Sequence, residues 1–176
     1  MSKNIIVLNG SPRKNGNTSQ LIRHFTQGAE SAGHTVTEFF LDGMDIHGCK
    51  GCLGGGKDPG SPCVQKDDMD KIYPAYQAAD IVVVASPLYF WTFSGQLRTA
   101  FDRLFAVAEC EPDYRNPKKG AVLLMAAEGD EFEQAAAYYD ALVRHLGWMD
   151  LGKVLCGGVM AVGDIAGKPA LGAALQ

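Results

Sequence analysis

The residues best suited to bind a ligand follow the first apolar run of the chain. That run, Ile5 to Leu8, leads into the loop Asn9-Gly10-Ser11-Pro12-Arg13-Lys14-Asn15-Gly16 and then into Asn17, Thr18 and Ser19, where an amphipathic segment begins. The first N–H groups of a helix have no partner within the helix and carry partial positive charge. These three residues can therefore offer amides and hydroxyls to one anion, which predicts a phosphate site.

Spacing argues against two other phosphate-binding loops. A nucleotide P-loop has four residues between its glycines and then Lys followed by Ser or Thr, whereas five residues separate Gly10 from Gly16, and Asn-Thr follows. The dinucleotide pattern Gly-x-Gly-x-x-Gly is absent because Ser11-Pro12 follows Gly10. For this loop alone, a polar strand-to-helix turn without a ligand stays the alternative.

A second loop concentrates aromatic residues. Ser86-Pro87-Leu88-Tyr89-Phe90-Trp91-Thr92-Phe93-Ser94-Gly95 follows the apolar run 81–85. So many large apolar side chains on a loop are typical of a surface that a flat ligand or another subunit covers; the alternative is that they form the core of the next helix. A third loop, 127–131, supplies Gly129 and carboxylates. Together the loops predict a ligand with a phosphate at one end and a flat ring at the other.

Alternating apolar runs and helical periods must position these loops. Apolar runs predict strands at residues 4–9, 35–41, 81–85, 121–126 and 154–162, the last interrupted by glycines. Helical spacing predicts helices at about 21–32, 67–79, 97–108 and 132–146, with about two turns of a last helix after the fifth strand. Pro74 should kink the second helix or shorten it to the part beyond the proline. This alternation predicts a parallel sheet with right-handed crossovers and helices on both faces.

Length and charge limit the possible partners. The chain has 176 residues, which fits a single domain over 1–176. Its formal net charge is −4, from 16 Lys and Arg against 20 Asp and Glu, and no basic stripe is present, which argues against nucleic acid as a partner. No apolar run approaches the ~18 residues of a membrane span, and no signal peptide opens the chain, so we expect a cytoplasmic protein without a membrane partner.

The first two loops together resemble a known family. Residues 5–19, Ser86-Pro87-Leu88-Tyr89 and the segment Gly95-Gln96-Leu97-Arg98-Thr99-Ala100-Phe101-Asp102-Arg103 are similar to motifs of the NADPH-dependent FMN reductase-like flavoproteins, a flavodoxin-like family that includes iron–sulfur flavoproteins. The similarity extends to the turn Val162-Gly163-Asp164-Ile165. It implies a flavodoxin-like, doubly wound α/β fold with a five-stranded parallel sheet of order 2-1-3-4-5, helices on both faces, and FMN across strands one and three.

The resemblance also assigns roles by position. It implies that the phosphate is held by Ser11, Arg13, Asn17, Thr18 and Ser19. It implies that the ribityl chain and the isoalloxazine ring lie along Pro87, Leu88, Tyr89, Phe90 and Trp91, with Gly129 at the ring's polar edge. Such proteins are commonly homodimers or homotetramers in which a neighbouring subunit helps to enclose the flavin. Exposed Trp91 and Phe93 would suit that arrangement.

The cofactor of this family carries most of the chemistry, so we assign no catalytic side chain. We expect an FMN-dependent oxidoreductase that uses NAD(P)H to reduce a quinone, free flavin or another small acceptor. The first alternative is a flavodoxin-type electron carrier that takes electrons from a protein partner and has no nicotinamide site. A ligand-sensing module that has lost its flavin is a further alternative, and it predicts a colourless protein.

The cysteines raise a separate question. In the reducing cytoplasm, Cys49, Cys52, Cys63, Cys110 and Cys156 are expected to be free thiols, metal or cluster ligands, or redox groups rather than disulfides. Cluster-binding relatives resemble this chain at Cys49, Cys52 and Cys63, but they carry a further cysteine at the position of Gly55.

A cubane cluster normally uses four thiolates. We therefore assign no metal and expect a loop of free thiols with less than about one iron per chain. Three alternatives stay open: a cluster held by three thiolates, a zinc ion or cluster with His47 as the fourth ligand, and a redox-active pair formed by Cys49 and Cys52.

Overall fold

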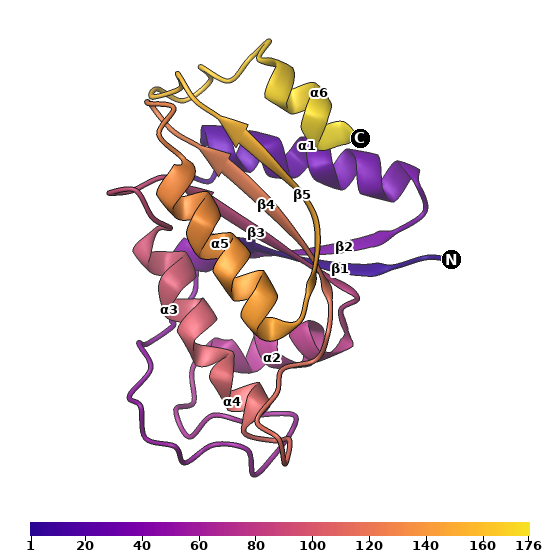
Figure 1. The fold of residues 1–176 in the computed structure, drawn as a ribbon, viewed down its shortest axis with the longest axis vertical. Coiled ribbons are helices and arrows are strands. Elements are labelled where there is room, and N and C mark those ends of the chain that lie inside the picture. Colours follow the sequence, from indigo (N-terminus) through magenta and orange to yellow (C-terminus); the bar gives the residue numbers. More distant parts are fainter.

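The computed structural model, which describes residues 1–176, contains one five-stranded sheet (Figure 1). Its strands are β1 (Asn4–Asn9), β2 (Thr35–Phe40), β3 (Ile81–Pro87), β4 (Gly120–Ala126) and β5 (Met149–Cys156). They lie in the order β2-β1-β3-β4-β5, and every pairing is parallel. The predicted fold class and strand order are confirmed. Because the order reverses between β1 and β3, the loops that follow these two strands lie side by side.

Helices cover both faces of the sheet. One face carries α1 (Asn17–Ser31) and α6 (Pro169–Leu175) (Figure 1). The opposite face carries α2 (Met69–Ala78), α3 (Gly95–Arg103), α4 (Phe105–Ala108) and α5 (Glu133–Leu146), and the short 3-10 turn η1 (Leu41–Gly43) follows β2. None of these helices combines the length and the apolar character needed to cross a membrane.

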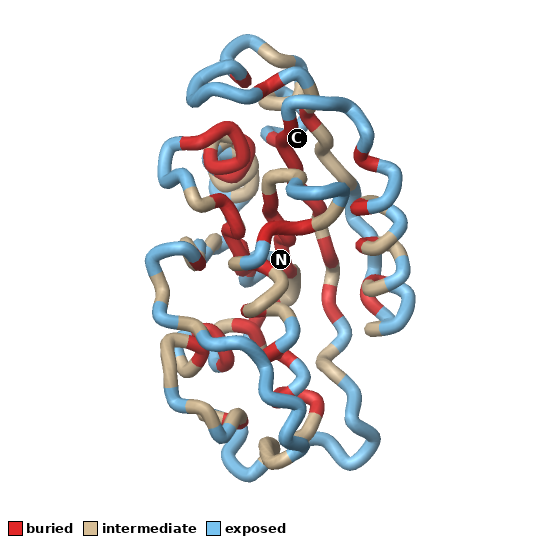
Figure 2. The backbone as a smooth tube through the Cα atoms, turned by 90° about the vertical axis from the view of Figure 1, so that its left-hand side faces the viewer, coloured by how far each residue is buried: buried red, intermediate tan, exposed pale blue.

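Successive side chains of each strand point to opposite faces of the sheet, so the core has two layers. In β1, Ile6 and Leu8 pack on the side of α2 to α5, whereas Ile5 and Val7 pack on the side of α1 and α6. The strands β3 and β4 are buried on both faces, which is why they read as continuous apolar runs. Figure 2 shows the buried residues gathered in the central strands and in parts of the helices, and the exposed residues in the surrounding loops and the rest of the helices.

The predicted bounds of the fifth strand are wrong. β5 begins at Met149 rather than at residue 154, and it ends at Cys156 rather than at residue 162. Its first half escaped detection because Met149 and Leu151 are exposed at the edge of the sheet, and because the register slips opposite Ala121 and Val122. Residues 157–162 belong instead to a loop that continues to α6.

Two helices also differ from the prediction. α2 runs through Pro74 and does not start after it. Proline removes one helical hydrogen bond, but Ile72, Tyr73 and Tyr76 are fully buried on this helix, and their burial outweighs one lost bond. The predicted helix over 97–108 is interrupted at Leu104, which separates α3 from α4.

Candidate functional site

A cavity of about 260 Å³ opens at the carboxyl ends of β1, β3 and β4. Four segments form its walls: the loop from β1 to α1, the loop from β3 to α3, the end of β4, and the loop after β5. The lining residues are Ser11, Arg13, Gly16, Asn17, Thr18, Pro87, Leu88, Tyr89, Ala126, Ala127, Glu128, Val159 and Met160.

The N-terminus of α1 presents unpaired donors at this cavity. Gly16 occupies the N-cap position with extended backbone and makes no side-chain cap. The N–H groups of Asn17, Thr18 and Ser19 consequently find no acceptor within the chain. Three orphan amides at the positive end of a 15-residue helix are the arrangement that suits an anion such as a phosphate.

The loop before α1 is held in shape by its own side chains. The Ser11 hydroxyl donates to the Arg13 carbonyl at 3.1 Å, and the Ser19 hydroxyl donates to the same carbonyl at 3.1 Å. The Asn9 amide donates to the Ser19 hydroxyl at 3.3 Å. Ser19 is buried and does not line the cavity, so the part of it left for an anion is the backbone N–H.

Two predicted phosphate ligands also hold the loop after β5. Arg13 Nη1 donates to the Met160 carbonyl at 2.9 Å, and Asn17 Nδ2 donates to the Ala161 carbonyl at 2.9 Å. The Asp164 carboxylate closes this loop, because it accepts from the N–H groups of Met160 and Ala161 at 2.9 and 2.7 Å. These two hydrogen bonds hold the pKa of Asp164 below its ordinary value.

Val159 and Met160 were not predicted to line a site, because residues 154–162 were predicted to form a strand. The available signal was the pair Gly157-Gly158 directly after the apolar run, since consecutive glycines break strands. Gly158 has a φ of +68°, which favours glycine and ends the extended conformation.

Gly10 and Ser94 join the first two loops. The Ser94 hydroxyl donates to the Gly10 carbonyl at 2.7 Å and accepts from the N–H of Leu97 at 3.3 Å, so it also caps α3. A Cβ atom on Gly10 would lie 2.6 Å from the Ser94 hydroxyl oxygen and 2.7 Å from the Leu97 Cβ atom. The Ser94 N–H in turn donates to the Ser86 hydroxyl at 2.8 Å. Only glycine permits this close approach of the loop from β1 to α1, here called the anion loop, and the loop from β3 to α3, here called the aromatic loop.

The aromatic loop contains a strained two-residue hairpin. Tyr89 and Thr92 exchange backbone hydrogen bonds of 3.0 and 3.1 Å across Phe90 and Trp91, whose φ angles are 46° and 61°. Such turns favour Asn-Gly, and each non-glycine residue in a sparsely populated conformation costs about 1–3 kcal/mol. The turn nevertheless presents Phe90 at 93% and Trp91 at 52% exposure. Strain that displays two aromatic rings to solvent is typical of a functional surface.

Only some of the predicted ring-binding residues line the cavity, and the turn separates these from the others. Pro87, Leu88 and Tyr89 line the cavity, whereas Phe90 and Trp91 are not among its lining residues. Phe93 is 3% exposed, so the expectation that it is exposed is wrong. It packs edge-on against Tyr138 of α5 at a centroid distance of 5.4 Å, because the turn directs position 93 back toward the core.

Gly129 lies in the third loop. Its neighbour Glu128 lines the cavity, but Gly129 does not. The Glu128 carbonyl accepts from the N–H of Gly158, and the Ala127 carbonyl accepts from the N–H of Val159, both at 2.9 Å. The third loop therefore contributes to the site by supporting the loop after β5.

A larger hollow of about 460 Å³ lies elsewhere, between α4 and the end of α5. Phe101, Phe105, Tyr114 and His145 are among its lining residues. It opens at the amino ends of the strands, away from the unpaired amides of α1, so we place the functional site in the smaller cavity.

The model of the NADPH-dependent FMN reductase family matches residues 3–164. The chain belongs to this family. It is an NAD(P)H-dependent FMN oxidoreductase, and FMN is its cofactor. The residues present fit this cofactor, because the unpaired amides at α1 suit a phosphate, and the side chains of Pro87, Leu88 and Tyr89 suit a flat ring.

Relatives of this FMN reductase include two archaeal proteins named iron–sulfur flavoprotein. One, from Archaeoglobus fulgidus, is 30% identical over 160 residues, which cover 88% of this chain and 70% of that protein. The other, from Methanosarcina thermophila, is 30% identical over 166 residues, which cover 93% of this chain and 82% of that protein.

Solved structures share the fold of this FMN reductase. An NAD(P)H:quinone oxidoreductase from Methanothermobacter marburgensis has a TM-score of 0.69 at 19% identity and covers 99% of this chain and 92% of its own. An FMN-dependent NADH-azoreductase from Bacillus anthracis, in complex with FMN, has a TM-score of 0.68 at 14% identity, with coverages of 97% and 95%. At these identities the likeness concerns the fold.

Proposed function

We propose that this FMN reductase transfers electrons from NAD(P)H to a quinone, free flavin or another small acceptor at the cavity between the loops after β1 and β3. The observation that carries the proposal is the Gly10–Ser94 junction. It sets unpaired helix amides beside an aromatic hairpin, which matches the two ends of FMN.

Within this proposal, the amides of residues 17–19 and the side chains of Ser11 and Thr18 bind the phosphate. Arg13 adds positive charge while it holds the loop after β5. Pro87, Leu88 and Tyr89 lie along the ribityl chain and the ring. Gly129 lies near the polar edge of the flavin ring, and its neighbour Glu128 lines the cavity there.

The chain's own residues bind and orient the cofactor, and FMN supplies hydride acceptance and electron return when it is bound. Glu128 is the one carboxylate in the cavity lining, and it is exposed to solvent. A proton required by the acceptor can therefore come from water, and we assign no catalytic acid or base.

We further infer that the protein is a homodimer or homotetramer. Phe90 and Trp91 are exposed in a strained turn that directly follows Tyr89 of the cavity lining. Burying a large apolar side chain contributes about 1.5–3 kcal/mol, which a second copy can supply by covering this turn. The measurement is sedimentation of the FMN-loaded protein.

Steady-state turnover tests the proposed activity. Purified protein loaded with FMN should oxidise NADH or NADPH with a quinone, an azo dye or free FMN at about 1 s⁻¹ or faster, as is common for enzymes. Free FMN at the same concentration is the control for uncatalysed reduction. Slow reduction of the bound flavin by both nicotinamides, combined with fast exchange with a reduced protein partner, would make the chain an electron carrier instead.

Trp91→Gly should separate ligand binding from folding stability. Glycine relieves the left-handed conformation at φ 61°, so we expect the flavin-free protein to unfold at an equal or higher temperature. We expect weaker FMN binding in a fluorescence titration, because the variant lacks the exposed indole that would cover the open side of the ring or the contact with a second copy. Phe105→Ala, at a comparably exposed aromatic side chain of α4, is the matched control. Unchanged FMN affinity and sedimentation in Trp91→Gly would remove this residue from the site.

A further inference from the structure

The segment between η1 and α2, residues 44–68, is here called the cysteine loop. Cys49 and Cys52 are exposed, Cys63 is half-buried, and all three thiols are free. The three cysteines line a cavity of about 40 Å³ together with Arg103 and Glu109. The thiols therefore border a small space that they share with a guanidinium and a carboxylate.

Glu109 occupies the space beside the position where the cluster-binding relatives carry another cysteine. A Cβ atom on Gly55 would lie well under 3.0 Å from the flexible end of the Glu109 side chain and 2.8 Å from the Pro62 backbone carbonyl oxygen. A Cβ atom on Gly56 would meet the backbone of the same glutamate. Two successive glycines thus allow the loop to lie directly on Glu109, which follows the C-terminus of α4.

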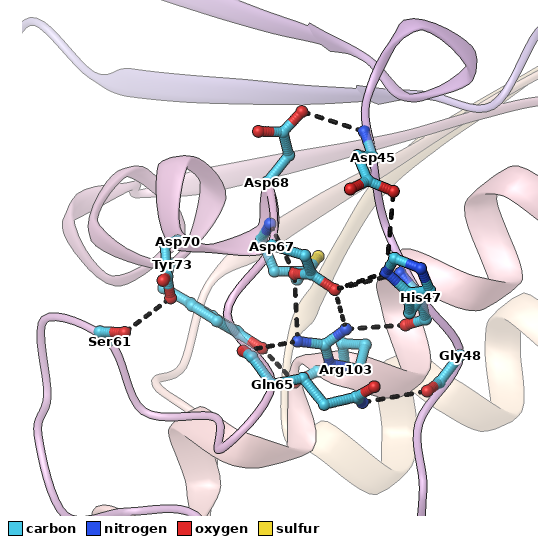
Figure 3. A network of polar contacts seen from close by, with 11 residues as sticks. Asp45, His47, Gly48, Ser61, Gln65, Asp67, Asp68, Asp70, Tyr73 and Arg103 are labelled. Carbon is cyan, nitrogen blue, oxygen red and sulfur yellow. Dashed lines mark hydrogen bonds and ion pairs between the residues drawn. The ribbon is translucent and has the colours of Figure 1, made fainter.

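A buried arginine clamps the two ends of the loop around this position. Arg103 Nη1 donates to the His47 carbonyl at 2.7 Å, and Nη2 donates to the Gln65 carbonyl at 3.3 Å (Figure 3). The guanidinium also pairs with the Asp67 carboxylate, with N–O distances of 2.6 and 3.2 Å. The side chains of this pair are 0% and 2% exposed. The arginine therefore fixes the loop on both sides of the cysteines.

His47 does not complete a cluster or zinc site. Its Nδ1 lies 3.7 Å from carboxylate oxygens of Asp45 and Asp67, and Figure 3 shows the ring between these two acids. The residue is not part of the cavity lining. No three His, Cys, Asp or Glu side chains come together in an arrangement that could hold a metal ion. The residues present therefore do not fit the cluster named in the relatives.

We propose that Glu109 replaces the missing thiolate sterically and holds the cysteine loop in a closed form that excludes an iron–sulfur cluster. The relatives at about 30% identity carry the cluster in their names; in this chain FMN is then the single redox centre. The proposal does not depend on which acceptor the enzyme reduces, since metal content and flavin content are measured separately.

The test starts with the natural chain. Protein purified without oxygen and treated with ferrous iron and sulfide should bind fewer than about one iron per chain and show a flavin spectrum without broad cluster absorption. Five titratable thiols should be present in denaturant, one for each free cysteine. About four irons with acid-labile sulfide would overturn the proposal, and so would one zinc per chain.

Engineered cysteines test the role of Glu109 itself. Gly55→Cys combined with Glu109→Ala restores the fourth thiolate and removes the blocking carboxylate, and we expect it to take up about four irons after the same treatment. Gly55→Cys alone should take up far less, because the glutamate remains. Equal uptake by these two variants, or no uptake by the folded double variant, would overturn the assignment of Glu109.

Gly54→Cys with Glu109→Ala is the matched control. A Cβ atom on Gly54 would meet the Val64 side chain at 3.3 Å and the Cys52 sulfur at 3.7 Å, so a side chain requires only a small shift of Val64. This variant adds a thiol at the wrong spacing and should not bind a cluster. Thermal unfolding of each variant shows which of them fold, and the result on the natural chain stands whether or not they do.

Discussion

Gly10→Val is expected to weaken FMN binding by about 10- to 100-fold while the sheet stays folded. The added side chain would begin 2.6 Å from the Ser94 hydroxyl oxygen and 2.7 Å from the Leu97 Cβ atom. Overpacking of this kind costs about 1–3 kcal/mol, and each 1.4 kcal/mol corresponds to about tenfold in affinity. The cost falls on the contact that aligns the anion loop with the aromatic loop, so binding should suffer directly.

The measurement is a titration of flavin-free protein with FMN, accompanied by thermal unfolding. Gly95→Ala is the matched control, because a Cβ atom on Gly95 at the start of α3 meets nothing within 4 Å. It should leave the affinity unchanged. An unchanged dissociation constant in folded Gly10→Val would show that the junction does not position the cofactor.

Asp67→Asn is expected to produce a large loss of stability, about 3–5 kcal/mol, because it leaves the buried Arg103 guanidinium without its counter-charge. The measurement is the free energy of unfolding from urea titration. Arg115→Gln is the control: Arg115 pairs with Asp113 at 3.6 Å, with side-chain exposures of 76% and 65%, and surface pairs contribute about 0–1 kcal/mol. Equal stability of the two variants would contradict a stabilising role for the buried pair of Arg103 and Asp67.

The same carboxylate predicts a pH dependence. Burial by itself would raise the pKa of Asp67, but hydrogen bonds from Arg103 and from the N–H groups of His47 and Met69 hold it below its ordinary value. Because the folded-state pKa is lower than the unfolded-state value of about 4, the ionised carboxylate stabilises the protein at pH values above 4. This stabilisation is lost as the pH falls through the folded-state pKa. Asp67→Asn should therefore unfold with a weaker acid dependence than the natural chain.

The elements buried on both faces were predictable from the sequence. β1, β3 and β4 carry side chains that are apolar on both sides, so their composition reports burial without any knowledge of neighbours. β5 was misplaced because an edge strand buries only part of its surface. Its exposed Met149 and Leu151 give no periodic signal, and its pairing with β4 is a long-range property.

The candidate site also has features that were predictable from the local sequence and features that depend on the tertiary fold. The unpaired amides of Asn17, Thr18 and Ser19 follow from the local sequence, because any helix start leaves such donors free. The use of the Ser19 hydroxyl inside the loop and the burial of Phe93 depend on partners elsewhere in the fold. Composition indicated many exposed aromatic side chains on the second loop but could not tell which of them turn inward.

The sequence by itself determined the α/β fold class and indicated the two loops suited to a phosphate and a flat ring, because residue types and spacings within short segments carry both signals. The family and FMN came from the resemblance of those segments to known motifs. Tertiary structure alone decided that the loop after β5 forms a wall of the cavity, and that Glu109 fills the space beside Gly55. Those contacts join segments that are distant along the chain. Packing of the whole sheet brings them together, and no local pattern records which side chain will occupy the space that a glycine leaves.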